Sequence, residues 1–162
     1  MLIKILLAGE GGQGVQTIAD VLSKTAFEKG LIVSSIPNYG LEQRGGVSLS
    51  YIKISDEEII YPRFTHPDIL LILSEQARER TKEYQAKSVK IIDINDYKNI
   101  LEKENIKLQG YNIFFLGLIA KILADKGVLG NKEVLDFLER KLSSKPGWED
   151  NKKAFEFGIN LK

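Results

Sequence analysis

The sequence predicts an α/β fold, a three-layer domain with a mostly parallel sheet and a helical C-terminal third. Three features support this class. Short aliphatic runs have the composition of strands that are buried on both faces of a parallel sheet. A glycine-rich loop follows the first of these runs and leads into an amphipathic helix. From about residue 96 onward apolar residues recur at helical spacing, and the 162 residues fit one domain, residues 1–162.

The N-terminal segments predict a strand–loop–helix–strand unit. Residues 2–8 (LIKILLA) form the first strand and residues 31–33 (LIV) form the second. Between them Val15, Ile18 and Leu22 recur at helical spacing, and the helix stops before the second strand. A unit of this order is typical of a Rossmann-like sheet with a right-handed crossover.

The middle of the chain predicts three more strands. Residues 37–46 (PNYGLEQRGG) have no periodicity and are rich in turn-forming residues, so we expect a loop there. Residues 47–55 alternate between apolar and polar and follow without an intervening helix. We therefore expect this strand to be antiparallel or at an edge of the sheet. Residues 68–73 and 89–92 have the composition of buried strands.

Helical periodicity and capping residues place the remaining elements. Ser74 and Asn131 are expected to cap two of the helices, because their side chains can accept a hydrogen bond from a first-turn amide. Gly158 is expected to interrupt the last helix near its end. The predicted helices are residues 75–84, 112–126, 131–142 and 148–159.

The charge balance and the residue counts exclude several kinds of function. The chain has 23 lysine and arginine residues and 22 acidic residues, which gives no basic stripe for nucleic acid. It has no cysteine, so it can hold no disulfide, thiolate zinc site or cysteine-ligated iron–sulfur cluster. The single histidine, His66, precedes a strand and so lies at the edge opposite to ligand sites. We expect no catalytic and no metal-binding residue in this chain.

No apolar run reaches the roughly 18 residues of a membrane span, and the first strand runs directly into the glycine loop. We therefore expect neither a membrane segment nor a targeting signal. The expected location is the cytoplasm.

The glycine loop follows the first strand with a known spacing. Gly9, Gly11 and Gly14 match GxGxxG between a strand and a helix. Glycine allows positive φ angles and a close approach of the backbone, and the first amides of the helix can bind an anion. The same glycines could serve only to make a tight turn. A nicotinamide cofactor is disfavoured, because the second strand leads into SSIP without the acidic residue that holds the ribose, and Glu10 lies inside the loop.

Five segments, in order along the chain, resemble the motifs of one protein family. GEGGQGVQT at residues 9–17 resembles the GxGGQGv motif of the gamma subunit of 2-oxoacid:ferredoxin oxidoreductases. YGLEQRGG at residues 39–46 resembles the family's YGPExRGG, and ISDEEIIYP at residues 54–62 resembles the segment that follows it. NIFFLG at residues 112–117 and NKKAFEFG at residues 151–158 resemble two later motifs, Asn-x-x-x-Leu-Gly and Asn-x-x-Ala-Phe-x-x-Gly.

The resemblance implies a role that fits the absent cysteines. Enzymes of this family oxidatively decarboxylate a 2-oxoacid with coenzyme A, which yields an acyl-CoA and two electrons for ferredoxin. In the family, thiamine diphosphate and Mg²⁺ are held by alpha and beta subunits, and iron–sulfur clusters by cysteine-bearing subunits or domains. These subunits, with ferredoxin as acceptor, are the expected partners. The chain itself is expected to be non-catalytic and to help form the coenzyme A environment. Residues 54–62 look closer to the 2-oxoglutarate type than to the pyruvate type.

The resemblance also implies a set of binding residues in the first two motifs. The amides of Gly11, Gly12 and Gly14 would be available to a phosphate or to a partner's backbone, and Gln13 could hydrogen-bond across a subunit interface. The full set is Gly9, Gly11, Gly12, Gln13, Gly14, Tyr39, Gly40, Glu42, Arg44, Gly45 and Gly46.

Arg44 is the charged residue of interest in the second motif. Its guanidinium could hold a carboxylate or phosphate through two parallel hydrogen bonds. It could equally form an ion pair with Glu42 or with a partner subunit. Tyr39 is expected to pack at an interface. Leu41 stands where the family usually has proline.

Two other functions are compatible with the sequence. One is a free-standing, dinucleotide-binding Rossmann-like oxidoreductase, which only the glycine spacing supports. The other is a small regulatory or structural domain that binds only protein. A subunit of a larger enzyme is expected to expose apolar surface, and residues 47–51 with Trp148, Phe155 and Phe157 are the candidates.

Overall fold

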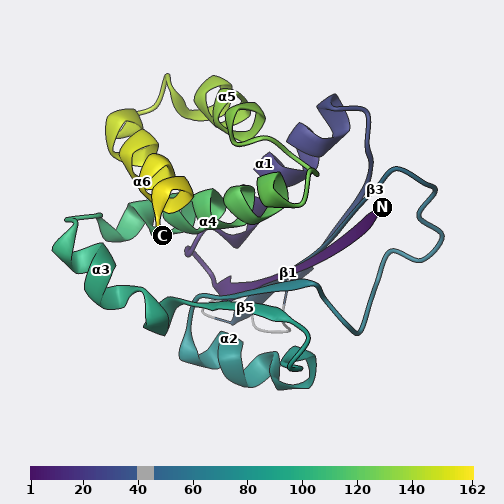
Figure 1. Ribbon diagram of the computed structural model, residues 1–162. Helices are drawn as coiled ribbons and strands as arrows, with labels where there is room; N and C mark the ends of the chain where they lie inside the picture. The colour runs from purple at the N-terminus through teal and green to yellow at the C-terminus, as the bar shows by residue number, and fades with distance from the viewer. Residues whose placement is uncertain (40–45) are drawn as a thin grey trace.

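A five-stranded sheet forms the centre of the computed structural model, which describes residues 1–39 and 46–162 (Figure 1). The strands are β1 (Leu2–Glu10), β2 (Ile32–Tyr39), β3 (Val47–Ser55), β4 (Ile69–Ile72) and β5 (Lys90–Asp93), in the order β2-β3-β1-β4-β5. β1 pairs with β4 and β4 with β5 in parallel, whereas β3 is antiparallel to β1 and to β2. Every strand except β3 therefore runs in one direction, and the predicted α/β class is confirmed.

β3 makes this sheet mixed. The prediction that residues 47–55 form an antiparallel strand is confirmed, but β3 lies between β2 and β1 and not at an edge. The predicted loop over residues 37–46 is wrong for residues 37–39, because β2 continues to Tyr39. Pro37 is tolerated there because β2 is an edge strand, where one missing N–H can face away from the ladder.

Helices cover the two faces of the sheet unequally, which gives three layers (Figure 1). On one face lie α1 (Val15–Glu28), α4 (Tyr111–Asp125), α5 (Asn131–Leu142) and α6 (Trp148–Asn160). On the other lies α2 (Glu75–Arg80), which a short 3₁₀ turn, Lys82–Tyr84, follows. The remaining elements are α3 (Lys98–Lys103) and the 3₁₀ turns Ile94–Asp96 and Leu108–Gly110.

β1 is buried on both faces, as its composition predicts. Ile5 and Leu7 belong to the large apolar cluster beneath α1 and α4, and Leu6 and Ala8 belong to the smaller cluster beneath α2. This division follows from the alternation of side chains along a strand. β1 therefore fixes the position of both helical layers.

α4 is apolar on nearly every side because other elements surround it. Phe114 and Phe115 are fully buried, and both rings make edge contacts with Tyr97. Within the described ranges no helix is both long enough and apolar enough to cross a membrane. The apolar character of α4 is thus explained by its central place in the core.

The two predicted helix caps have different outcomes. Ser74 caps α2 as predicted, since its hydroxyl accepts a hydrogen bond from the Ala77 amide at 3.0 Å. Asn131 is not the cap of α5, because it is already the first residue of the helix and Gly130 precedes it as the N-cap. The Glu133 carboxylate accepts the Gly130 amide at 2.7 Å and satisfies this end of the helix instead.

α4 and α6 cross at two glycines. A Cβ on Gly117 would lie 2.4 Å from the Phe155 carbonyl oxygen, and one on Gly158 would lie 2.3 Å from the Phe114 carbonyl oxygen. Both distances are far below van der Waals contact, so only glycine permits this approach. The prediction that Gly158 interrupts the last helix is therefore wrong, because α6 runs through it to Asn160.

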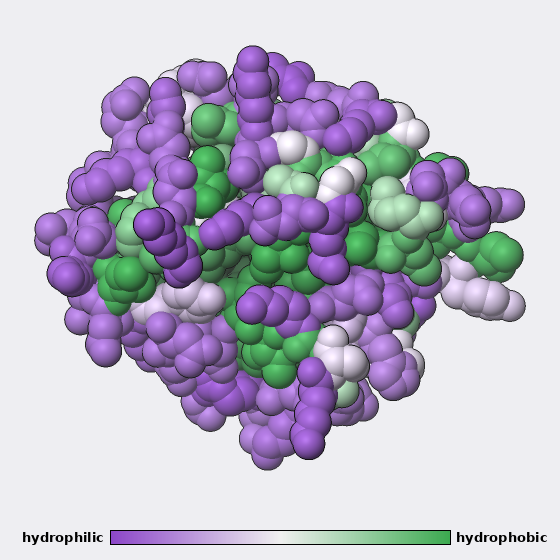
Figure 2. All heavy atoms as spheres, in the orientation of Figure 1, coloured by the Kyte–Doolittle hydropathy of each residue, from purple (hydrophilic) through white to green (hydrophobic). Residues whose placement is uncertain are grey.

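The exposed apolar side chains are not those expected from the sequence. Phe155 is fully buried, Tyr51 is buried in β3, and Trp148 and Phe157 pack against the main core. Ile60 and Tyr61, in the segment between β3 and β4, are instead 74% and 77% exposed. Figure 2 shows a largely hydrophilic surface with hydrophobic side chains gathered near its centre and at the right-hand end.

Gly158→Ala is expected to destabilise the chain by about 2 kcal/mol, because the added methyl group must push α6 away from α4. The midpoint of thermal unfolding should fall by roughly 4–8 °C. Gly11→Ala is the matched control, since a Cβ on Gly11 has nothing within 4 Å. Equal midpoints for the two variants would contradict the proposed close contact.

Candidate functional site

The glycine loop lies at the carboxyl edge of the parallel strands. It follows β1 directly, and Leu73 and Ile94 follow β4 and β5 at the same edge. Ligands of open α/β sheets bind at this edge, where successive strands lead into different elements. His66 precedes β4 and so lies at the opposite edge, as predicted, with its Nδ1 2.9 Å from the Thr65 hydroxyl.

Strand register brings Tyr39, the first residue of the second motif, to the same edge. Gly9 pairs with Ser48, and Ser48 pairs on its other side with Tyr39. The glycine loop, the end of β2 and the start of β3 are therefore neighbours. Tyr39 is 67% exposed there, which is compatible with an interface role. The predicted site residues Gly40, Glu42, Arg44 and Gly45 lie outside the described residues, and Gly46 is half-buried.

Three of the four glycines in the loop have a structural reason. Gly12 and Gly14 have φ angles of 86° and 78°, in the left-handed region that glycine adopts without strain. A Cβ on Gly9 would lie 2.9 Å from Val15 Cγ2, so the start of the loop has no room for a side chain. Gly11 is open to solvent and has no such restriction.

The Gln13 side chain is bonded within the chain. Its Oε1 accepts the Glu10 backbone N–H at 2.7 Å, and its Nε2 donates to the Leu73 carbonyl at 2.9 Å. The sequence assigns Gln13 a hydrogen bond across an interface. In the structure the carboxamide ties the glycine loop to the end of β4 instead.

A cavity of about 560 Å³ opens beside the loop. Its lining comes from the loop and from the segments that follow β4, β5 and α3: Gly11, Gly12, Gln13, Gly14, Thr17, Leu73, Ile94, Leu108, Gln109, Tyr111 and Asn112. None of these described residues carries a formal charge. The cavity therefore offers amides, hydroxyl groups and apolar surface to a ligand.

The N-terminus of α1 adds backbone donors to the cavity. Gly14 is its N-cap residue, and no side chain of the described residues caps the helix. The first N–H groups of a helix have no intrahelical partner, and the helix dipole adds a partial positive charge there. This end of α1 can therefore accept an anionic or hydrogen-bond-accepting group.

The first turn of α4 supplies a side of the cavity that sequence reasoning missed. Asn112 lies directly on the loop, since a Cβ on Gly14 would be 2.2 Å from Asn112 Nδ2. Thr17 and Tyr111 also line the cavity. Asn112 begins one of the motifs that resemble the family, but nothing local in the sequence connects it with Gly14, about 100 residues earlier.

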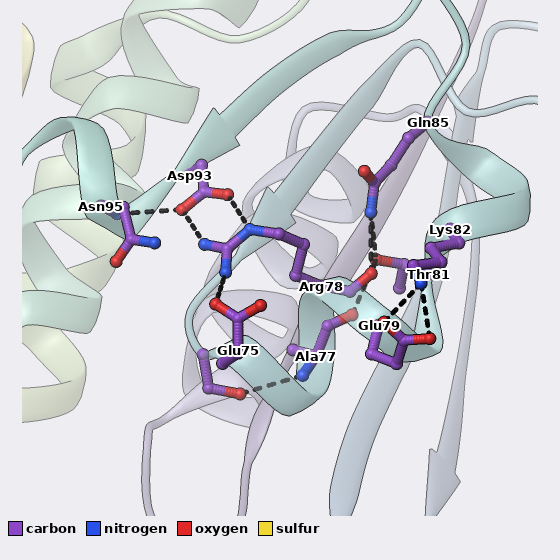
Figure 3. A network of polar contacts seen from close by, with 10 residues as sticks. Glu75, Ala77, Arg78, Glu79, Thr81, Lys82, Gln85, Asp93 and Asn95 are labelled. Atoms are coloured by element: carbon purple, nitrogen blue, oxygen red, sulfur yellow. Dashed lines mark hydrogen bonds and ion pairs between the residues drawn. The ribbon is translucent and has the colours of Figure 1, made fainter.

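An ion pair joins α2 to the end of β5, one residue before Ile94, which lines the cavity (Figure 3). Arg78 donates to the Asp93 carboxylate through Nε at 2.7 Å and Nη2 at 2.5 Å, and it also pairs with Glu75. Asp93 accepts the Asn95 backbone N–H at 2.9 Å as well. This arrangement fixes the turn that carries Ile94 into the cavity wall.

The same contacts shift the pKa of Asp93. Burial raises the pKa of this carboxyl group, but the hydrogen bonds from Arg78 and the Asn95 amide outweigh burial and hold the pKa below its ordinary value. The pKa of the Arg78 guanidinium is raised by the same partner. Both groups are therefore charged across the physiological range.

The structure also bears on metal binding and on dinucleotide binding. Within residues 1–39 and 46–162, no three histidine or acidic side chains come together as a metal site. In a dinucleotide-binding fold the acidic residue for the ribose ends the strand beside β1. Here β3 occupies that place, and β2 lies two strands away from β1. The glycine spacing therefore lacks the neighbour that a dinucleotide site needs.

The mixed sheet, with a cavity at the carboxyl edge of its parallel strands, defines an α/β domain with a candidate ligand site. Residues 4–93 match the pyruvate ferredoxin/flavodoxin oxidoreductase family, which is more than half of the chain. The chain belongs to this family, and the resemblance seen in the sequence is confirmed.

One relative has a more particular name. "2-Oxoglutarate synthase subunit KorC" of Methanothermobacter marburgensis is 39% identical over 110 residues, which cover 64% of this chain and 59% of that protein. The matched part of this chain thus spans about three fifths of the length of that relative.

Solved structures share the fold at low sequence identity. The 2-oxoglutarate:ferredoxin oxidoreductase of Magnetococcus marinus, with 2-oxoglutarate, coenzyme A and succinyl-CoA bound, matches 99% of this chain with a TM-score of 0.81 and 19% identity. The match covers 31% of that longer chain. The gamma subunit of a keto/oxoacid ferredoxin oxidoreductase from Geobacter sulfurreducens matches 97% of this chain and 96% of its own, with a TM-score of 0.72 and 22% identity. The chain therefore has the fold of this gamma subunit.

Asp93→Asn is expected to lower the free energy of unfolding by about 2 kcal/mol at pH 7, because it removes the charge that Arg78 binds. A carboxylate whose folded-state pKa is depressed stabilises the fold above its unfolded pKa of about 3.9 and loses this effect as the pH falls through the folded value. The difference between wild type and variant should therefore shrink below about pH 4. Urea unfolding at pH 7, 5 and 3 measures it.

Glu79→Gln is the control for this measurement, since the Glu79–Lys82 pair is mostly exposed. It should change stability by less than about 0.5 kcal/mol at every pH. An Asp93→Asn effect that is equally small at pH 7 would show that the ion pair does not stabilise the cavity wall.

Proposed function

We propose that this chain is the gamma subunit of a 2-oxoacid:ferredoxin oxidoreductase of the 2-oxoglutarate type, and that its glycine-loop cavity forms part of the coenzyme A environment. The observation that carries the proposal is the uncharged cavity at the carboxyl edge, where Gly12, Gly14 and the open end of α1 present backbone N–H groups. The family, the name of the KorC relative and the coenzyme A in the related Magnetococcus enzyme support the choice of ligand and substrate.

The donors of the cavity fit the phosphate groups of coenzyme A. Phosphate oxygens accept hydrogen bonds, and helix N-termini with glycine-rich approaches bind them without a cationic side chain. Gly11, Gly12 and Gly14 would hold such a group, with Thr17 and Asn112 beside it. When bound, coenzyme A supplies the thiol that accepts the acyl group.

In this proposal the reaction itself takes place on partner chains. A 2-oxoacid loses CO₂, its acyl group forms a thioester with the sulfur of coenzyme A as the thiol proton is released, and two electrons pass to ferredoxin. This chain has no cysteine for a cluster. From the family resemblance we assign thiamine diphosphate and Mg²⁺ to alpha and beta subunits and the iron–sulfur clusters to a cysteine-bearing subunit or domain, and we expect the assembly in the cytoplasm. Arg44 remains a prediction, either as a residue that binds an anion or as one that forms an ion pair with Glu42 or with a partner subunit.

Purification of the tagged chain from its native extract under mild conditions tests the assembly. We expect a brown complex that contains two or three further chains and thiamine diphosphate. The complex should reduce ferredoxin in a reaction that needs coenzyme A, and faster with 2-oxoglutarate than with pyruvate. A colourless, solitary chain of 18.2 kDa under conditions that preserve complexes would contradict the proposal.

Gly12→Ala tests the role of the loop within that complex. The alanine must adopt a φ angle of 86°, at a cost of roughly 1–2 kcal/mol, so the loop should shift. The half-saturating concentration of coenzyme A is expected to rise about tenfold. The half-saturating concentration of the 2-oxoacid should stay unchanged.

Gly127→Ala is a matched control for this variant. Gly127 has a φ angle of 70° and, like Gly12, open space around its Cβ position, but it lies between α4 and α5. It introduces similar backbone strain away from the cavity. If both variants alter the coenzyme A dependence equally, or neither does, the loop is not the coenzyme A site.

A further inference from the structure

We infer that Gln13 is a positioning residue, whose carboxamide holds the amides of the glycine loop in the geometry that receives the ligand. This inference rests on the proposed function for the identity of the ligand, but its structural part concerns only this chain. It replaces the role that the sequence suggests for Gln13, a contact with a partner chain.

The two hydrogen bonds of Gln13 require a carboxamide in one orientation. Oε1 faces an N–H group, from Glu10 at 2.7 Å, and Nε2 faces a carbonyl, of Leu73 at 2.9 Å. The flipped amide would place like groups against each other at both positions. Asparagine has the same groups but is one methylene shorter, so it cannot span the two partners.

These two hydrogen bonds extend the contact between β1 and β4 beyond the last residue pair of the two strands. β1 and β4 are paired as far as Ala8 and Ile72, and the Leu73 amide then donates to the Ala8 carbonyl at 2.9 Å. Beyond this point the chains separate, because β1 leads into the loop and β4 leads into α2. Gln13 bridges them where they part, and both Gln13 and Leu73 line the cavity that opens there.

The missing side chain of Gly9 makes room for this bridge. A Cβ on Gly9 would lie 3.0 Å from Gln13 Oε1 and 3.3 Å from Leu73 Cβ. Glycine at position 9 therefore leaves room for the carboxamide. The first glycine of the motif and its glutamine form one structural unit.

Two substitutions separate the hydrogen bond that Gln13 accepts from the one that it donates. Gln13→Glu keeps an acceptor for the Glu10 amide but sets a carboxylate oxygen against the Leu73 carbonyl. Gln13→Met keeps the approximate shape and loses both bonds. In the assembled enzyme each variant should raise the half-saturating concentration of coenzyme A about tenfold, with a much smaller change in kcat at saturating coenzyme A.

Gln85→Glu is the matched control. Gln85 is also a half-buried glutamine, and its Nε2 donates to the Arg78 carbonyl at 2.8 Å, so the variant likewise sets a carboxylate oxygen against a backbone carbonyl. It introduces the same charge outside the cavity lining and outside α1. Its coenzyme A dependence should match wild type, and an increase equal to that of Gln13→Glu would show that the charge, and not the positioning of the glycine loop, is responsible.

Hydrogen exchange in the chain itself tests the geometry without any ligand. The Glu10 amide should exchange at least tenfold faster in Gln13→Met than in wild type, and at a near wild-type rate in Gln13→Glu, which retains the acceptor. Unchanged exchange in Gln13→Met would overturn the inference. If exchange behaves as expected but no variant of the loop, including Gly12→Ala, alters coenzyme A dependence, then the proposed function fails while the positioning of the loop by Gln13 stands.

Discussion

The pairing of β1 with β3 along the whole of both strands is the constraint on which the rest of the structure depends. The register runs from Leu2 opposite Ser55 to Glu10 opposite Val47. Because side chains alternate along a strand, a slip of one residue would turn Ile52 and Ile54 away from the main core. The same register places the start of β3, and through it the end of β2, beside the glycine loop. Core packing and the assembly of the candidate site are thus fixed by one set of backbone hydrogen bonds.

The cavity exists because β1 has different neighbours on its two sides. Antiparallel β3 approaches the glycine loop with its start, and parallel β4 ends beside the loop and turns into α2. The loop therefore lies between the first residues of β3 and the last residues of β4. Burial of Leu6 and Leu7, each worth roughly 1.5–3 kcal/mol, keeps β1 rigid up to the first glycine. Gln13 and the Arg78–Asp93 ion pair then fix the two segments that leave the sheet.

The sequence predicts what depends on neighbours along the chain, and it fails where distant segments meet. The first strand, the helix after the glycine loop and the Ser74 cap follow from local patterns and are present in the structure. The prediction for Gly158 is wrong for this reason. Glycine weakens an isolated helix, so the sequence predicts an interruption, but the close contact of α6 with α4 requires glycine at this position. The internal position of β3 and the packing of Asn112 on Gly14 are also long-range, and no periodicity encodes them. Gln13 combines both situations. The sequence shows the motif that contains it, but the sequence does not predict its hydrogen-bond partner Leu73, which is 60 residues away.

The chemistry of the cavity explains why a chain of this kind would work as part of a larger enzyme. A ligand bound with a dissociation constant of 1 μM requires about 8 kcal/mol of binding free energy. A helix N-terminus supplies roughly 2 kcal/mol at most to an anion, even when it is partly buried. The described residues that line the cavity carry no charge to add to this. Most of the affinity for a polyanion such as coenzyme A must therefore come from groups outside this lining. The geometry of this cavity is suited to one contribution, a fixed set of backbone amides that positions one part of a ligand. Other groups would then supply the charge and the reactive centre.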